Sequence, residues 1–210
     1  MSQPTAASIT GVILAGGRAT RMGGVDKGLV PLAGRPMVEH IIDRLRPQTA
    51  ALLINANRSH EIYAQYGLPL VADRLGDYAG PLAGMASGLA ASATEWVVTV
   101  PCDSPLVPPD LVARLCEAVR RENAELAVAT GAGRLQPVFA LLPRALLVSL
   151  EEFLAAGERK IDRWYGRHHM ALADFEDTPE AFLNVNTPAD CDALEARLRT
   201  EAGSAGIGTD

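Results

Sequence analysis

Residues 14–27 read Leu-Ala-Gly-Gly-Arg-Ala-Thr-Arg-Met-Gly-Gly-Val-Asp-Lys and continue an apolar run, residues 9–14, that is typical of a buried strand. Four glycines lie in this loop together with the cations Arg21 and Lys27. Glycine has no Cβ, so its backbone can approach a ligand closely, and N–H groups exposed in such a loop bind oxyanions. The stretch therefore predicts a strand followed by a loop that binds nucleotide phosphates. The alternative is a glycine-rich surface turn with solvated charges.

Two common phosphate-binding patterns do not fit this loop. A Walker A motif needs Ser or Thr after its lysine, and Gly28 follows Lys27. The dinucleotide-binding pattern G-x-G-x-x-G does not occur in the first sixty residues. The pattern that fits, L-A-G-G-x-x-x-R-M-G-G-x-D-K, is typical of nucleotidyltransferases, which move a nucleoside monophosphate from a triphosphate.

Strand-like and helix-like segments alternate after this loop. We predict strands at residues 9–14, 51–55, 68–72 and 95–100, and helices at residues 36–46, 59–66, 81–92 and 109–121. This order predicts an α/β fold with a doubly wound, mostly parallel sheet in three α/β/α layers.

The second half of the chain has a less regular pattern. We predict strands at residues 125–130, 136–142, 170–175 and 182–185, and helices at residues 143–156, 161–165 and from Pro188 to about Arg199. Thr187 can cap this last helix, since Pro188 suits its first position. We expect one domain over residues 1–200 and a flexible tail, residues 201–210.

The composition is that of an ordinary globular protein. The chain has 210 residues, of which 48% are hydrophobic and 21% charged, and its formal net charge is -6. The negative charge argues against nucleic acid as the main partner. The sequence contains no run of about twenty apolar residues, so we predict no membrane-spanning helix. The three cysteines do not pair at metal-ligand spacing, which is typical of reduced thiols in a cytoplasmic protein.

Three polar residues lie at or just after the carboxyl ends of predicted strands, at the edge where open α/β sheets bind ligands. Asp103 is the candidate ligand for Mg²⁺, which takes one or two carboxylates together with phosphate oxygens and water. Its alternative is an aspartate that ends a strand in a proline-rich turn. Asn55 and Asp73 suit base or ribose recognition. The alternative for Asn55 is an asparagine in a turn after the strand. The alternative for Asp73 is a helix cap or a salt bridge with Arg74.

Lys27 and Arg21 are the candidate catalytic cations, because each could stabilise negative charge on a triphosphate and in the transition state. The alternative for each is a solvated surface cation. Cys102 has no histidine near it in sequence and follows an apolar run, which is typical of a small packing residue and not of a nucleophile.

Six motifs, in order, closely resemble those of the bacterial molybdenum cofactor guanylyltransferase family. They span about residues 11–197 and read L-A-G-G-x-x-x-R-M-G-G-x-D-K, N-A-N-R, D-Y-A-G-P-L-A-G-M, P-C-D-S-P-L-V-P-P-D-L, A-G-E-R-K and F-L-N-V-N-T-P. The resemblance implies a Rossmann-like nucleotidyltransferase fold. It also implies transfer of GMP from GTP to molybdenum-bound molybdopterin, with an N-terminal half that binds GTP and a C-terminal half that binds molybdopterin. Molybdoenzyme maturation chaperones are candidate partners.

The resemblance also implies roles for single residues, with Asp103 as the Mg²⁺ ligand. Together with the cations argued above from their charge, the expected catalytic residues are Lys27, Arg21 and Asp103. Position and charge alone suggest Arg159, Lys160, Asn184 and Asn186 for the pterin. The implied nucleotide contacts, with Gly17 added from its place in the loop, are Leu14, Ala15, Gly16, Gly17, Lys27, Asn55, Asp73 and Asp103.

Three other functions stay open on the sequence alone. The enzyme could transfer CMP to the same pterin, although Leu14-Ala15-Gly16-Gly17 in place of L-A-A-G favours guanine. It could act on a sugar phosphate. It could also be a non-catalytic, GTP-responsive carrier of finished cofactor.

Overall fold

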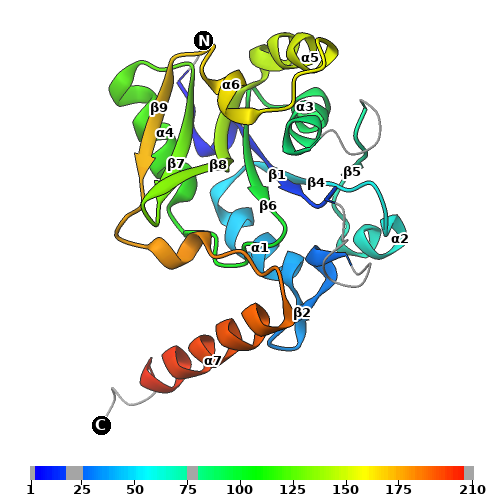
Figure 1. The fold of residues 1–210 in the computed structure, drawn as a ribbon, viewed down its shortest axis with the longest axis vertical. Coiled ribbons are helices and arrows are strands. Elements are labelled where there is room, and N and C mark those ends of the chain that lie inside the picture. Colours follow the sequence, from blue (N-terminus) through cyan, green and yellow to red (C-terminus); the bar gives the residue numbers. More distant parts are fainter. Residues whose placement is uncertain (1–2, 18–25, 75–79, 206–210) are drawn as a thin grey trace.

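The computed structural model describes residues 3–17, 26–74 and 80–205. Its centre is a seven-stranded sheet with the strand order β5-β4-β1-β6-β8-β7-β9 (Figure 1). Neighbouring strands are parallel except that β8 is antiparallel to both β6 and β7. The strands are β1 (Ile9–Leu14), β4 (Ala51–Asn55), β5 (Leu70–Val71), β6 (Trp96–Pro101), β7 (Leu126–Gly131), β8 (Arg134–Pro143) and β9 (Met170–Asp174).

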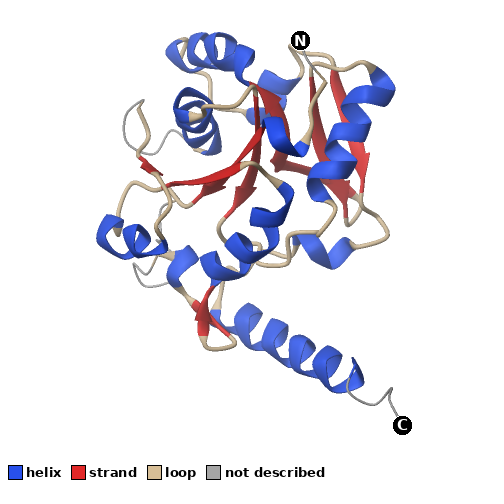
Figure 2. Cartoon of the chain, turned by 180° about the vertical axis from the view of Figure 1, so that it is seen from behind, coloured by secondary structure: helices blue, strands red, loops and turns tan. Residues whose placement is uncertain are grey.

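Helices cover both faces of this sheet (Figure 2). Adjacent strand residues point to opposite faces. Ile13 therefore packs in the core layer under α1 and α4, and Val12 packs in the layer under α3, α5 and α6. Both side chains are fully buried, so the predicted three-layer, mostly parallel fold is confirmed. The helices are α1 (Met37–Leu45), α2 (His60–Tyr63), α3 (Pro81–Ala91), α4 (Leu111–Glu122), α5 (Leu147–Ala155), α6 (Ile161–Tyr165) and α7 (Pro188–Ala205).

Helix α3 lies unusually close to the sheet because its inner face is made of small residues. A Cβ added at Gly88 would lie 2.9 Å from the Val12 methyl groups. This close packing brings the first turn of α3 to the carboxyl ends of β1 and β4, where the predicted ligand-binding residues lie.

A small third core holds the C-terminal helix against the N-terminal half. The hairpin of β2 (Pro31–Leu32) and β3 (Arg35–Pro36) was not predicted. Leu32 packs there with Cys191 and Leu194 of α7. Helix α7 then extends away from the sheet (Figure 1) and continues past Arg199 to Ala205, so it takes in residues 201–205 of the expected tail.

The predicted strand at residues 182–185 is wrong. Phe182 ends a short 3-10 helix, Pro179–Phe182, and its ring packs 4.9 Å from Phe139 and 5.6 Å from Phe175. The next residues make one sheet-like bond, from Val185 N to Asp103 O at 2.8 Å. Burial of an aromatic side chain, and not strand pairing, explains the apolar pattern.

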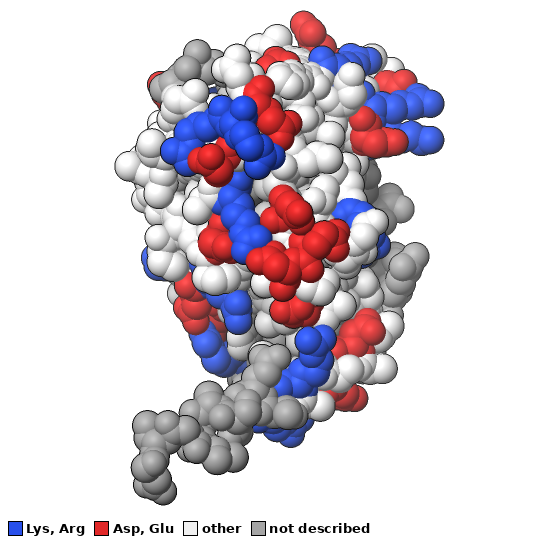
Figure 3. All heavy atoms as spheres, turned by 90° about the vertical axis from the view of Figure 1, so that its left-hand side faces the viewer, with Lys and Arg blue, Asp and Glu red and all other residues white. Residues whose placement is uncertain are grey.

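The surface mixes charges of both signs on the face drawn in Figure 3. Among the described residues, Arg114 forms ion pairs with both Asp110 and Asp177, at 2.7 Å each. Such pairing differs from the one-signed basic stripe expected of a nucleic-acid surface. No helix in the described ranges is long and apolar enough to span a membrane.

Candidate functional site

A cavity of about 710 Å³ opens at the carboxyl ends of β1, β4 and β6. All the described residues that we predicted to bind nucleotide line it together. Arg21 lies outside the described residues. The lining residues with predicted roles are Leu14, Ala15, Gly16, Gly17, Lys27, Asn55, Asp73 and Asp103.

Lys27 joins the start and the end of the chain inside this site. Its Nζ donates to Asp103 Oδ2 at 2.9 Å and to Asn186 Oδ1 at 2.6 Å. The Lys27 side chain is 24% exposed and that of Asp103 is 18% exposed, so water screens the pair only partly. The structure thus brings the candidate catalytic cation Lys27 and the candidate metal ligand Asp103 together at the sheet edge.

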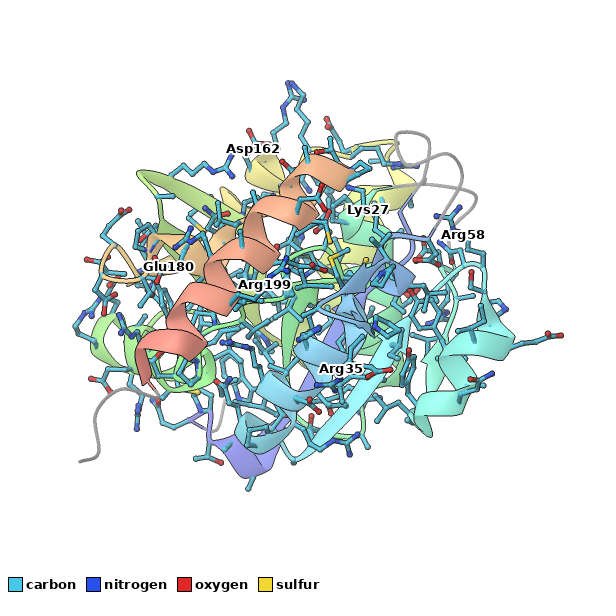
Figure 4. The ribbon with its side chains drawn as sticks, turned by 90° about the horizontal axis from the view of Figure 1, so that it is seen from below. Lys27, Arg35, Arg58, Asp162, Glu180 and Arg199 are labelled. Carbon is cyan, nitrogen blue, oxygen red and sulfur yellow. The ribbon has the colours of Figure 1, made fainter. Side chains whose placement is uncertain are left out.

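A buried carboxylate holds the backbone that carries Lys27. Asp26 is 6% exposed, and its Oδ1 accepts from Gly28 N at 3.3 Å and from Tyr63 Oη at 2.8 Å. Arg58 pairs with Oδ2 at 3.5 Å, and Figure 4 shows Lys27 and Arg58 on the same side of the molecule. Burial, reinforced by the neighbouring Asp26 carboxylate, raises the pKa of Tyr63, so its hydroxyl stays a donor.

Asn55 and Asp73 form one hydrogen-bonded unit with Asn57. Asn55 Nδ2 donates to Asp73 Oδ1 at 2.9 Å, and Asn57 Nδ2 donates to Asp73 Oδ2 at 2.8 Å. The backbone N–H of Asp73 returns a bond to Asn57 Oδ1 at 2.8 Å. The salt bridge considered for Arg74 goes instead to Glu151, at 3.6 Å. We did not predict a role for Asn57. The sequence signal that could have indicated one is its spacing of two residues from Asn55.

Two glycines let the backbone come close to Asn55. A Cβ at Gly16 would lie 3.2 Å from Asn55 Oδ1, and one at Gly84 would collide with the same atom. Gly84 lies in the first turn of α3, so this helix can approach Asn55 and Leu14 only without a side chain there. Gly80, with φ of 77°, is the N-cap residue of α3.

The other half of the cavity is built by β8. Asn184 lines it, as we expected for the pterin side, but Arg159 and Lys160 are absent from its lining. Arg159 instead donates to the carbonyls of Leu154 and Glu158 at 2.8 Å and 2.6 Å. Sequence reasoning missed this wall. Its residues are Arg134, Leu135, Gln136, Pro137, Val138 and Phe139.

Cys102 lies in the cavity wall, but its chemistry is unsuited to nucleophilic attack. Burial raises the pKa of the thiol, and the neighbouring carboxylates of Asp103 and Asp26 raise it further. A thiol with a raised pKa gives little thiolate, which is the reactive form. The predicted packing role agrees with this, and Cys102, Cys116 and Cys191 are all free thiols.

The oxygen ligands available around Asp103 fit a hard divalent cation that takes most of its ligands from substrate and water and few from the protein. Lys27 occupies Oδ2, whereas Oδ1 has no hydrogen-bond partner among the described residues. Within the same part of the chain, no three His, Cys, Asp or Glu side chains gather as a closed metal cage. A single free carboxylate oxygen on a residue that lines the cavity suits Mg²⁺, which takes its other ligands from phosphate and water.

A family model described as the MobA-like NTP transferase domain matches residues 11–171. The chain belongs to the MobA-like NTP transferase family. This MobA-like protein is therefore a nucleotidyltransferase. It is 50% identical over 196 residues to the molybdenum cofactor guanylyltransferase of Shewanella pealeana, covering 93% of this chain and 98% of that one. It is 52% identical over 180 residues to the protein of that name from Shewanella loihica, covering 86% and 92%.

Solved structures of other proteins share the fold. Molybdopterin-guanine dinucleotide biosynthesis protein A from Archaeoglobus fulgidus superposes with a TM-score of 0.76 at 20% identity, over 91% of this chain and 99% of that one. The 4-diphosphocytidyl-2C-methyl-D-erythritol synthase of Anaerococcus prevotii superposes with a TM-score of 0.72 at 13% identity, over 91% and 96%. The same fold thus occurs in proteins with different named activities.

Proposed function

We propose that this MobA-like protein transfers GMP from GTP to molybdenum-bound molybdopterin, which forms molybdopterin guanine dinucleotide and releases pyrophosphate. The observation that carries the proposal is the meeting of Lys27, Asp103 and the glycine loop at one two-sided cavity. The names of relatives about 50% identical over most of the chain support guanine and molybdopterin as the substrates.

GTP would occupy the half of the cavity between β1, β4 and α3. The N–H groups of the loop after Leu14 would receive its phosphates. Asn55 and Asp73 would contact the base or the ribose, since their hydrogen-bonded unit lies beside this loop. The first turn of α3 adds the positive end of a helix dipole to the same side.

The acceptor phosphate would attack the α-phosphorus from the side of β8. One oxygen of that phosphate forms the new P–O bond as the bond to the β-phosphate oxygen breaks, and pyrophosphate leaves. The attacking oxygen is already ionised near neutral pH, so no general base is needed. Lys27 would hold the two anionic groups together, and positioning with charge stabilisation would supply most of the acceleration. Arg21 would add a second cation.

Asp103 would hold Mg²⁺ through its carboxylate. The bound cation would neutralise phosphate charge. We further propose a cytoplasmic enzyme, because its cysteines are free thiols, and molybdoenzyme maturation chaperones as recipients of its product.

Pyrophosphate release and dinucleotide formation, measured with GTP, Mg²⁺ and molybdenum-bound molybdopterin, test this function. The proposal expects both products in equal amounts, and much slower turnover with CTP. Faster turnover with CTP would identify a cytidylyltransferase, and transfer only to a sugar phosphate would identify another acceptor. Binding of GTP without any pyrophosphate would identify a carrier.

A further inference from the structure

The cavity wall on β8 contains a bulge at the place where it borders the site. Val128 of β7 pairs with Ala140 of β8, but the next residue, Ala129, pairs with Gln136. Residues 137–139 therefore have no partner on β7. Because β8 runs antiparallel to β6 and Thr99 pairs with Ala140, this bulge lies beside the carboxyl end of β6.

Buried hydroxyl groups fix the shape of this bulge. Tyr165 Oη donates to Pro137 O at 2.6 Å, and Thr99 Oγ1 donates to Val138 O at 2.7 Å. Both donor residues are at most 1% exposed. Bulges redirect side chains next to active sites, and here two dedicated hydroxyl donors satisfy the carbonyls that the ladder leaves free.

Gln136, at the start of the bulge, is a buried amide with one unused acceptor. It is 6% exposed and lines the cavity. Its Nε2 donates to Gly131 O at 2.9 Å. A carbonyl oxygen can only accept, so this bond fixes which end of the amide is nitrogen. Gln136 Oε1 is left with no hydrogen-bond partner among the described residues.

We propose that Gln136 Oε1 is a specificity-determining acceptor for the pterin ring of the second substrate, an inference that rests on the proposed function. A 2-amino-4-oxo-pteridine presents N–H donors at its 2-amino group, and Gln136 Oε1 would accept from this group. The flat ring would lie against the apolar side chains of Leu135 and Val138. A site built to pair with a ligand N–H rejects an analogue that lacks it, because a buried polar group is then unpaired.

Binding of two pteridines, measured by fluorescence, tests this assignment. The probes are 6-hydroxymethylpterin phosphate and the corresponding lumazine phosphate, in which an oxygen replaces the 2-amino group. A non-hydrolysable GTP analogue is present at saturation, so that the nucleotide half is filled. We expect the wild-type protein to bind the pterin at least about tenfold more tightly than the lumazine, which corresponds to about 1.4 kcal/mol.

Three variants separate ligand recognition from a structural role. Gln136→Met keeps the side-chain shape without polar atoms and should abolish the preference for pterin. Gln136→Glu removes the bond to Gly131 but keeps an acceptor, and should retain the preference. The matched control Gln65→Met changes an exposed glutamine outside the cavity and should bind like the wild type.

Loss of the preference in both Gln136 variants, or its retention in Gln136→Met, would overturn the assignment. In the transfer assay, Gln136→Met should raise the KM for molybdopterin at least about tenfold and leave the KM for GTP unchanged. Equal increases in both KM values would also overturn it. A wild-type protein that prefers pterin but releases no pyrophosphate would refute the proposed function and leave the role of Gln136 standing.

Discussion

Lys27 Nζ lies 2.9 Å from Asp103 Oδ2, and the two residues are 76 positions apart in the sequence. The contact joins the loop after β1 to the segment after β6. The strands β1 and β6 are parallel neighbours in the sheet. Each side chain thereby has a partner of opposite charge before any substrate binds. A triphosphate and Mg²⁺ would replace this pair with two others, phosphate with Lys27 and the cation with Asp103.

Replacing Lys27 by alanine should lower kcat/KM for GMP transfer at least tenfold, or about 1.4 kcal/mol, because the ammonium group would no longer contact phosphate in the transition state. Pyrophosphate release measures the effect. The chain's other lysine, Lys160, is exposed and absent from the cavity lining, so Lys160→Ala should retain activity. Similar losses in both variants would argue that Lys27 has no special role.

Replacing Asp103 by asparagine should abolish Mg²⁺-dependent turnover, since the amide keeps the shape but not the charge that binds a hard cation. Circular dichroism should show a retained fold, because Val185 bonds to the Asp103 carbonyl and not to its side chain. A titration of activity against Mg²⁺ provides the measurement. A variant with a normal magnesium dependence would remove Asp103 from the metal site.

Replacing Tyr63 by phenylalanine should reduce the free energy of unfolding by about 1–3 kcal/mol, because the buried Asp26 carboxylate would lose a donor. Chemical denaturation measures this change. Tyr66 is more exposed than Tyr63, so Tyr66→Phe is a matched control with a smaller expected effect. An equal cost for both variants would contradict the role of Tyr63 in holding Asp26.

Replacing Gly84 by alanine should raise the KM for GTP, since the added methyl group would displace Asn55 Oδ1 and with it the bond to Asp73. Gly166→Ala is the control, because its Cβ would meet only backbone oxygens at 3.4 Å and beyond, an ordinary contact distance. Steady-state kinetics with varied GTP compares them. An unchanged KM in Gly84→Ala would exclude Asn55 from nucleotide binding.

Protonation of Asp190 should loosen the start of α7. Its carboxylate accepts from the N–H groups of Asn186 and Thr187, both at 2.9 Å, and these bonds lower its pKa below the usual 3.8. Because the pKa of Asp190 is lower in the folded state than in the unfolded state, its charged form stabilises the fold. This stabilisation is fully present at pH values above the unfolded-state pKa, and it is lost as the pH falls through the folded-state pKa. Asp190→Asn should therefore flatten the acid side of the Tm profile below about pH 4.

Asp192 provides the control for that experiment, because it is an exposed aspartate on the same helix. The variant Asp192→Asn should keep the wild-type slope of Tm against pH. If both variants or neither flatten the profile, the cap formed by Asp190 does not control the acid response.

The first half of the fold was predictable because each buried strand there is a short apolar run between glycine, proline or asparagine signals. The same logic failed at Phe182, whose burial among aromatic rings produces an apolar pattern without a strand. Hydrophobicity reports burial, and it does not report what a segment packs against.

The site was predictable where its residues end parallel strands, as Asn55 and Asp103 do. The wall formed by β8 was not, because Gln136 enters the cavity through a shift in strand register. Register depends on pairs such as Ala129 with Gln136, which no single segment reveals. Asn57 was missed although it alternates with Asn55 in the sequence, because its bond to Asp73 is seen only in the folded chain.

The bond between Lys27 and Asn186 spans 159 residues, and it has a consequence for how the protein is made. A chain emerging from the ribosome can form β1 and its neighbours early, but Lys27 gains this partner only when residue 186 has emerged. At about 5–20 residues per second, the delay is on the order of ten to thirty seconds. A nascent chain would thus complete its catalytic centre among the last events of its synthesis.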